Sequence, residues 1–231
     1  MTIKEAYKLD AENNNMMWRD TIRKEMKNAS IAFEIQESDT PPRGYIETTY
    51  HMIFEVKMDF TRKARIVADD HKIPEPSMSS HAGVVSRDTI RIAFTFAALN
   101  DLDICAADIK NAHLQVPNSE RHYTICGPEF ETKKNRKIAI VVRALYGGKV
   151  AGANFRNHLR DCMEHLGYQS CLADPDLWMK VSVKPNNDRY WHYVLLYVNN
   201  MLSIGVEPQG TVAVIGKYFQ MKPESVGTLD L

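Results

Sequence analysis

The stretch Y-V-L-L-Y-V-N-N-M-L-S-I-G-V at residues 193–206 decides the fold class of this 231-residue chain. An apolar and aromatic run comes first, two asparagines follow, and a second, largely apolar run comes after them. Continuous apolar runs of this length are typical of strands buried on both faces. Two polar residues between such runs predict a β-hairpin, with Asn199 and Asn200 as its turn, because asparagine tolerates positive φ.

A second strand is predicted beside this hairpin, at residues 102–108 (L-D-I-C-A-A-D), and it ends on the carboxylate of Asp108. Periodicity and turn residues predict the other elements. These are helices at 10–29, 87–100, 109–117 (short), 152–166 and 210–220, and strands at 50–57, 62–68, 137–142, 176–183 and 190–198. Helices alternating with hairpins in this order indicate an α+β fold with a largely antiparallel sheet.

Two of these helices carry more specific predictions. Asp10 is expected to be the N-cap of the first helix, and Ser86 that of the helix at 87–100. The segment I-R-I-A-F-T-F-A-A-L at 90–99 is apolar nearly all round. A helix of this composition is expected to be buried.

Composition narrows the function classes. Hydrophobic residues make up 44% and charged residues 25% of the chain, and 29 basic residues balance 29 acidic ones. This is the profile of a globular protein without a global basic excess, although Thr132 to Lys149 holds six basic residues and no acid. The four cysteines form no C-x-x-C pair, so no structural metal site is expected. No signal core or run of 18 apolar residues occurs, so we expect an intracellular protein, cytoplasmic or nuclear, without a membrane partner.

Several motifs follow one another along the chain. They are W-x3-I-x2-E-M at 18–26, V-K-M-D-F-T-R-K-A-R-I-V-A at 56–68, A-A-D-I-K-N-A-H-L at 106–114, C-G-P-E-F at 126–130, R-A-L-Y-G-G-K at 143–149, A-D-P-D-L-W at 173–178 and Y-V-N-N-M-L at 197–202. In this order they resemble the copia-type retrotransposon reverse transcriptases. The resemblance extends from about residue 10 to residue 220.

The resemblance implies the fingers and palm of a right-hand polymerase, with an antiparallel palm sheet packed on helices. Most of the thumb is then absent. The implied segments are 1–48 (N-terminal helix and lead-in), 49–101 (fingers hairpin and helix), 102–220 (palm with an inserted fingers segment) and 221–231 (start of a truncated thumb or tail).

The resemblance also implies RNA-directed DNA polymerase chemistry, with a primer–template and a deoxynucleotide as partners. Other segments of a polyprotein are further possible partners. Such enzymes hold two Mg²⁺ ions between three aspartates, because carboxylate oxygens neutralise the ion's charge. Asp108 matches the first aspartate, whereas Asn199 and Asn200 stand at the other two positions. Because two negative charges are lost, we predict weak Mg²⁺ binding, with Asp108 as the remaining ligand, and an inactive centre.

Further roles come from the resemblance. The residues implied to bind nucleotide are Arg62, Lys63, Arg65, His113 and Lys149. The basic side chains would neutralise a triphosphate. His113 stands where the family places the Phe or Tyr that senses the sugar 2′ position, and Tyr197 would pack near a primer end.

Other interpretations stay open beside these. Asp108 could merely cap the following helix, and three basic residues on a hairpin are often a solvated face. The chain could be a non-enzymatic nucleic-acid-binding remnant that uses Arg62, Lys63, Arg65 and Lys149 on phosphates. It could also be a decayed fragment with no retained function.

Overall fold

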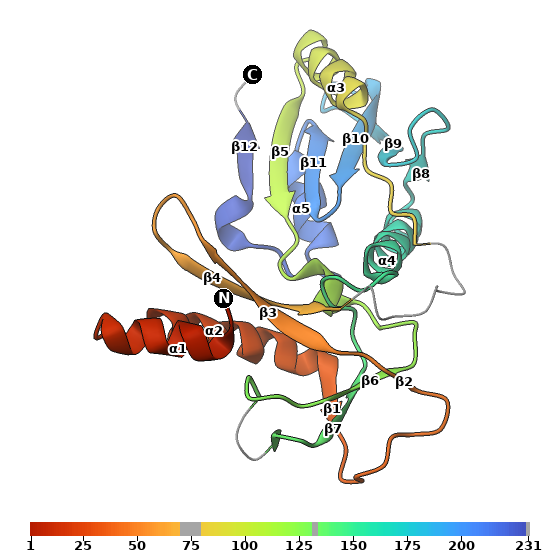
Figure 1. Cartoon of the computed structure of the whole chain (residues 1–231). Helices are drawn as coiled ribbons and strands as arrows, with labels where there is room; N and C mark the ends of the chain where they lie inside the picture. Colours follow the sequence, from red (N-terminus) through yellow and green to blue (C-terminus); the bar gives the residue numbers. More distant parts are fainter. Residues whose placement is uncertain (70–79, 131–133, 230–231) are drawn as a thin grey trace. The chain divides into compact units, whose positions relative to one another are not determined.

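The computed structural model describes residues 1–69, 80–130 and 134–229, and its chain forms two compact units (Figure 1). The first unit comprises Met1–Ser80 and Val116–Asn154, and the second comprises His81–Gln115 and Phe155–Leu231. Lys133 of the basic run and the last two residues of the predicted tail lie outside the described residues. The four segments predicted from the sequence stay a prediction.

The first unit begins with two helices, α1 (Ile3–Glu12) and α2 (Met17–Ala29), and a 3₁₀ turn at Ser30–Ala32. The prediction of one helix over 10–29 was therefore wrong, because Asn14 between the two helices takes a φ of 50°. Asp10 is not an N-cap of its own helix. It is buried within α1, and its carboxylate accepts hydrogen bonds from the backbone N–H groups of Trp18 (3.0 Å) and Arg19 (2.9 Å) in the first turn of α2.

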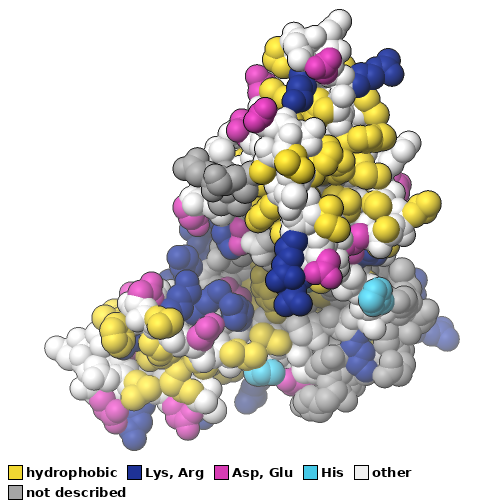
Figure 2. Space-filling model, turned by 90° about the horizontal axis from the view of Figure 1, so that it is seen from above, with side chains coloured by type: hydrophobic (Ala, Val, Ile, Leu, Met, Phe, Trp, Pro, Cys, Tyr) yellow, Lys and Arg dark blue, Asp and Glu magenta, His cyan; other side chains and the backbone are white. Residues whose placement is uncertain are grey.

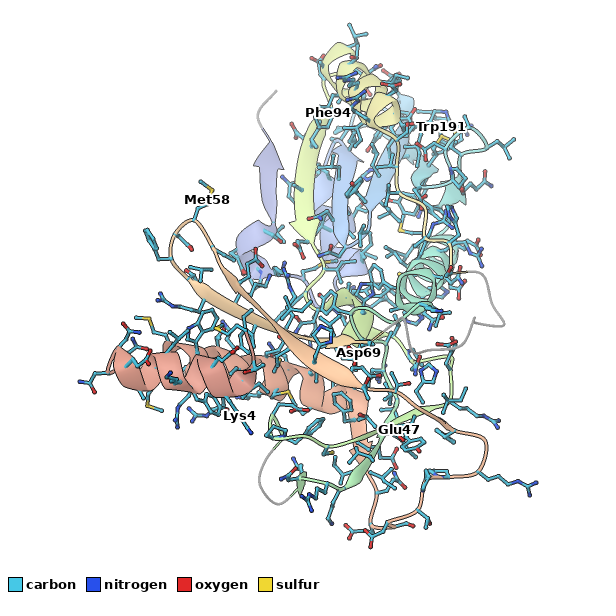
Figure 3. All side chains as sticks on the ribbon, viewed as in Figure 1. Lys4, Glu47, Met58, Asp69, Phe94 and Trp191 are labelled. Carbon is cyan, nitrogen blue, oxygen red and sulfur yellow. The ribbon has the colours of Figure 1, made fainter. Side chains whose placement is uncertain are left out.

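The strands of the first unit form a hairpin and a small sheet. β3 (Tyr50–Val56) and β4 (Arg62–Ala68) pair antiparallel, as predicted, and β4 packs on α2. Met58 at the hairpin tip is fully exposed and points away from the ribbon (Figure 3). The small sheet has the strand order β1 (Phe33–Ile35), β7 (Ile138–Val141), β6 (His122–Ile125) and β2 (Ile46–Glu47).

The second unit is built on an antiparallel sheet. Its strand order is β12 (Gly227–Leu229), β5 (Asp103–Asp108), β11 (Asn200–Gly205), β10 (Arg189–Tyr197), β9 (Leu177–Val183) and β8 (Gln169–Ser170). The predicted strands at 102–108, 176–183 and 190–198 are thus confirmed to within one residue at each end. The α+β class and the largely antiparallel sheet are confirmed as well.

Helices lie on both faces of this sheet. They are α3 (Arg87–Leu99), α4 (Ala151–His165), whose residues from Phe155 onward belong to this unit, and α5 (Pro208–Ile215). α5 packs behind β5 and β11, while α3 crosses one end of the other face (Figure 1). The segment predicted as a short helix at 109–117 is a 3₁₀ helix at Ala112–Gln115, and another 3₁₀ turn spans Pro223–Ser225.

The expected burial of α3 was wrong. Ser86 caps the helix as predicted, but only Ala93 and Ala97 are buried, against Ile104 and neighbouring core residues. The small alanines pack one stripe closely on the sheet, whereas Ile92 is 70% exposed on the helix's outer side. Hydrophobic side chains are plentiful on the surface seen in Figure 2. No helix in the described ranges combines the length and the apolar composition needed to span a membrane.

Candidate active site

The ends of β5 and β11 bring the predicted carboxylate position and the asparagines together. Asp108, the last residue of β5, stands opposite Asn200, the first residue of β11. β10 completes the arrangement, because its last residue, Tyr197, stands opposite Asn200 on the other side. The proximity of Asp108 to the hairpin, which the family resemblance required, is therefore observed. The catalytic roles of these residues stay predictions.

The hairpin turn differs from the predicted one by one residue. Its two residues are Val198 and Asn199, so Asn200 belongs to the strand rather than to the turn. The positive φ of 54° is held by Val198, not by an asparagine. A β-branched residue is strained there, because its side chain crowds the backbone. Asn200 pairs with both Tyr197 and Asp108, and this pairing fixes the position of the turn. Turn preference alone would place the two asparagines in the turn.

The carboxylate of Asp108 is engaged by two other side chains. Its Oδ1 accepts a hydrogen bond from Nδ2 of Asn199 at 2.9 Å. Its Oδ2 lies 2.6 Å from the ammonium group of Lys222, and the Asp108 side chain is only 19% exposed. The backbone around it is held as well, because the Asp108 N–H donates to Oγ of Ser225 at 2.9 Å. Asp108 is thus part of an internal ion pair.

Lys222 is the residue that sequence reasoning missed. It lies 114 positions from Asp108 along the chain, beyond the end of α5. Its backbone N–H donates to the Asp108 carbonyl at 2.9 Å, so the main chain brings the ammonium group beside the carboxylate. No local sequence pattern around Lys222 indicates this contact with Asp108. Only the pairing of distant segments could have identified it.

These donors do not fit a two-magnesium centre. Such a centre needs several carboxylate oxygens around the ions. Here one carboxylate faces an ammonium group, and Asn199 directs its N–H donor, not its carbonyl, at that carboxylate. Within the described parts of the chain, no group of three or more His, Cys, Asp or Glu residues is placed to hold a metal ion. The cationic position beside Asp108 is taken by Lys222.

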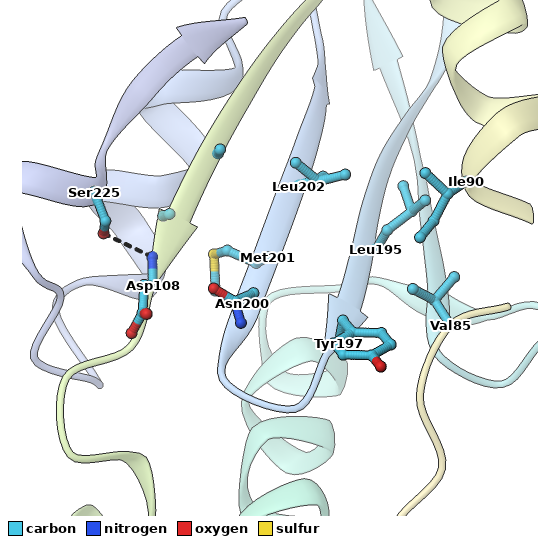
Figure 4. Close-up of a pocket in the computed structure, with 11 residues that line it drawn as sticks. Val85, Ile90, Asp108, Leu195, Tyr197, Asn200, Met201, Leu202 and Ser225 are labelled. Atoms are coloured by element: carbon cyan, nitrogen blue, oxygen red, sulfur yellow. Dashed lines mark hydrogen bonds between the residues drawn. The ribbon is translucent and has the colours of Figure 1, made fainter. Parts of the chain in front are cut away.

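A pocket opens on the α3 side of the sheet next to these residues (Figure 4). Its volume is about 380 Å³, and it is lined mainly by apolar side chains. They include Val85, Ile90, Leu195 and Leu202, with Asp108, Tyr197, Asn200 and Ser225 at its polar end. The pocket exists because α3 covers the sheet around Ile104 but leaves the surface around Ala106 open. Tyr197 is 52% exposed.

Comparisons with known proteins agree with this architecture. No protein-family model and no curated protein matches the sequence significantly. Two solved structures are similar: apo telomerase from Candida tropicalis, truncated from the C-terminal domain, and telomerase from Candida albicans in complex with a TWJ fragment of telomeric RNA. Each has a TM-score of 0.50 and 8% sequence identity over 92% of this chain. Telomerases are polymerases related to reverse transcriptases.

The fold of this chain is polymerase-like. At 8% identity the likeness concerns the fold alone. The chain covers 55% and 46% of the two telomerase chains, so it spans about half of their length.

His113, another predicted nucleotide-binding residue, belongs to the same unit of this polymerase-like fold. It lies in the 3₁₀ helix after β5, and its ring centre is 6.1 Å from that of Phe155 in an edge-to-face arrangement. It is not among the residues that line the pocket beside Asp108.

The predicted basic residues belong to the first unit and do not share one surface. Alternation along β4 places Lys63 and Arg65 on one face, and Arg62 on the opposite face, which packs on α2. There the Arg62 guanidinium lies 5.9 Å from the centre of the Trp18 ring. Lys149 is half-buried in the connection between β7 and α4. The structure thus groups Lys63 with Arg65 and separates Arg62 from both.

The opposite face of the second unit's sheet contains a buried histidine behind the hairpin. Nε2 of His192 on β10 lies 2.9 Å from the hydroxyl oxygen of Ser203 on β11. Burial, together with the nearby charge of Lys180, lowers the pKa of His192 to about 4. The imidazole is therefore neutral at pH 7, and its ring packs against Gly205, where a Cβ atom would overlap it.

Proposed function

We propose that this chain is the reverse-transcriptase fingers and palm of a copia-type retrotransposon, with a palm that no longer catalyses nucleotide transfer. The ordered motifs and the polymerase-like fold support the first part. The second part depends on one observation, namely that Lys222 and Asn199 occupy both oxygens of Asp108. In this proposal Mg²⁺ is at most a weak ligand of the site.

The physical reason is a deficit of negative charge. Phosphoryl transfer by two ions requires carboxylates that hold both cations against the attacking and leaving oxygens. Here Asp108 supplies one negative charge, and Lys222 offsets it at 2.6 Å. A metal ion would have to displace this ammonium group and would then find only neutral amides at residues 199 and 200. Because about 1.4 kcal/mol of barrier costs a factor of ten in rate, the lost ligands reduce turnover by several orders of magnitude.

Nucleic acid remains the proposed partner class even without turnover. Lys63 and Arg65 share one face of the hairpin in the first unit, although Arg65 is already 3.4 Å from the Glu55 carboxylate. Basic side chains on a strand can follow a phosphate backbone without a metal. A non-enzymatic nucleic-acid-binding domain is therefore the second candidate function.

A primer-extension assay tests the proposal. The wild-type chain should give no product above that of an Asp108→Ala variant, with either Mg²⁺ or Mn²⁺. The double variant Asn199→Asp, Asn200→Asp restores both carboxylates and should give metal-dependent extension. Robust extension by the wild type would refute the proposed inactivity. A silent double variant would mean that other departures, such as His113, also block the chemistry.

A further inference from the structure

A second cavity lies within the first unit, and its described lining includes none of the residues predicted to bind nucleotide. Its volume is about 750 Å³, within the range of small-ligand sites. It lies among α1, α2, β1 and the residues on either side of 131–133. We call it the basic groove and define it by Tyr7, Arg19, Arg23, Lys27, Phe130 and Lys134. None of Arg62, Lys63, Arg65 and Lys149 lines it.

The basic residues of the groove form a row along α2. Arg19, Arg23 and Lys27 are spaced by four residues, so they lie on one face of the helix with a rise of about 6 Å per step. Arg19 and Lys27 are exposed and make no ion pair with any described residue. Arg23 is 3.0 Å from Asp20, in an exposed pair that contributes little. Their charges are therefore available to an anionic ligand.

The charge balance of the groove favours an anion. Four basic side chains line it, including Lys134, against the single acid Glu129 among the described lining residues. Glu129 is partly buried, and this burial raises the pKa of its carboxyl. A row of cations with one acid beside it is expected to attract phosphates or carboxylates.

Aromatic rings indicate which anion is favoured. The Arg19 guanidinium lies 4.6 Å from the centre of the Tyr7 ring, so a planar cation is already stacked on an aromatic face. Phe130 is partly exposed in the groove and meets the buried Phe33 edge to face at 5.1 Å. Basic side chains that alternate with aromatic surfaces are typical of sites for single-stranded nucleic acid, where bases stack and phosphates pair.

We propose that the basic groove binds a short segment of single-stranded nucleic acid. Its phosphates lie along Arg19, Arg23 and Lys27, and its bases stack on Tyr7 and Phe130. The inference depends on the proposed function only in taking nucleic acid as the partner class, and it requires no active palm. An acidic protein segment would use the charges but not the rings.

The test is fluorescence anisotropy with the full chain and a labelled oligothymidylate, repeated over a range of salt concentrations. The variant Arg19→Gln, Lys27→Gln should bind about tenfold or more weakly, and the slope of log affinity against log salt should fall by roughly 1.4. The matched control is Lys4→Gln, Lys24→Gln, which removes the same charge from α1 and α2 outside the groove. This control should stay near the wild type. Tyr7→Leu should lose about fivefold or more in affinity with an unchanged salt slope, because it removes stacking but no charge.

Three outcomes would overturn the inference. Equal losses in the groove variant and its control would mean diffuse attraction rather than a site. Unchanged affinity in the groove variant would exclude the groove. Polyglutamate that displaces the oligonucleotide at equal charge concentration would identify an acidic protein segment as the occupant. Robust primer extension by the wild type, with intact and groove-dependent oligonucleotide binding, would instead contradict only the proposed function.

Discussion

The substitution Asn199→Asp places a second carboxylate against Asp108 and gives a direct measure of the charge balance at this site. The hydrogen bond from Nδ2 of Asn199 to Oδ1 of Asp108 spans 2.9 Å. Losing a hydrogen bond to a charged group costs about 1.5–3 kcal/mol. Two carboxylate oxygens at that separation would repel by about 6 kcal/mol at an effective dielectric constant of 20 before relaxation. Lys222 and rotation of the new side chain offset part of this, so we expect a net destabilisation of about 2 kcal/mol.

The assay is thermal unfolding at pH 7 with EDTA or with Mg²⁺. In EDTA the variant should melt about 4–8 °C below the wild type. Mg²⁺ should recover much of this loss, because an ion that binds only the folded state stabilises it. The wild type should show no such response. Asn14→Asp, at an exposed asparagine between α1 and α2, is the matched control. It should melt near the wild type in EDTA, and Mg²⁺ should not change its melting temperature.

Two results would refute this reasoning. If Asn199→Asp melts like the wild type in EDTA, the Asn199 amide does not stabilise the Asp108 carboxylate. If the wild type gains as much from Mg²⁺ as the variant does, its own donors suffice for the metal, and Lys222 does not take the cation's place.

Three further predictions concern the sheet of the second unit. Burial lowers the pKa of His192 from 6.5 to about 4. Below pH 6.5 the unfolded chain therefore binds a proton that the folded chain does not bind. The free energy of unfolding decreases as the pH falls from 6.5 towards 4. Urea unfolding should show a loss of about 2 kcal/mol between pH 7 and pH 4.5 that is absent in His192→Gln. Val198→Asn should raise the free energy of unfolding by about 1 kcal/mol, because asparagine tolerates the φ of 54° better; a decrease would show that the valine is not strained. Gly205→Ala should lower that free energy by about 1–3 kcal/mol, because its Cβ would overlap the His192 ring, and an unchanged unfolding midpoint would contradict this packing.

The main strands could be predicted from the sequence, because their apolar runs are long and end in clear polar positions. Asp108 and the asparagines lie together as expected. The turn could not be placed correctly, because asparagine is the better turn residue locally, whereas cross-strand pairing puts Val198 in the left-handed position. The turn preference of asparagine and the pairing between strands favour different residues here, and the strand pairing determines the conformation of the turn.

The errors in the helices have different physical causes. The predicted first helix divides because Asn14 leaves the helical conformation between two segments that both show helical periodicity. The apolar composition of α3 suggested burial on all sides, yet only Ala93 and Ala97 are buried against the sheet, while Ile90, Phe94 and Phe96 are packed there only in part. Composition reports which residues can be buried, but not how many neighbours are present to cover them. The Lys222 contact was beyond prediction, because nothing near it in the sequence points to Asp108.

The position of Asp10 has a consequence for how this chain can be divided. The Asp10 carboxylate in α1 accepts hydrogen bonds from backbone N–H groups in the first turn of α2. A fragment that began at residue 16 would keep every residue of α2 but would lose these acceptors. Its first turn would then fray, and Arg19 would leave the row it forms with Arg23 and Lys27. α1 thus holds the first turn of α2 in place. A fragment designed to contain the first unit should therefore begin before residue 3, so that it includes all of α1.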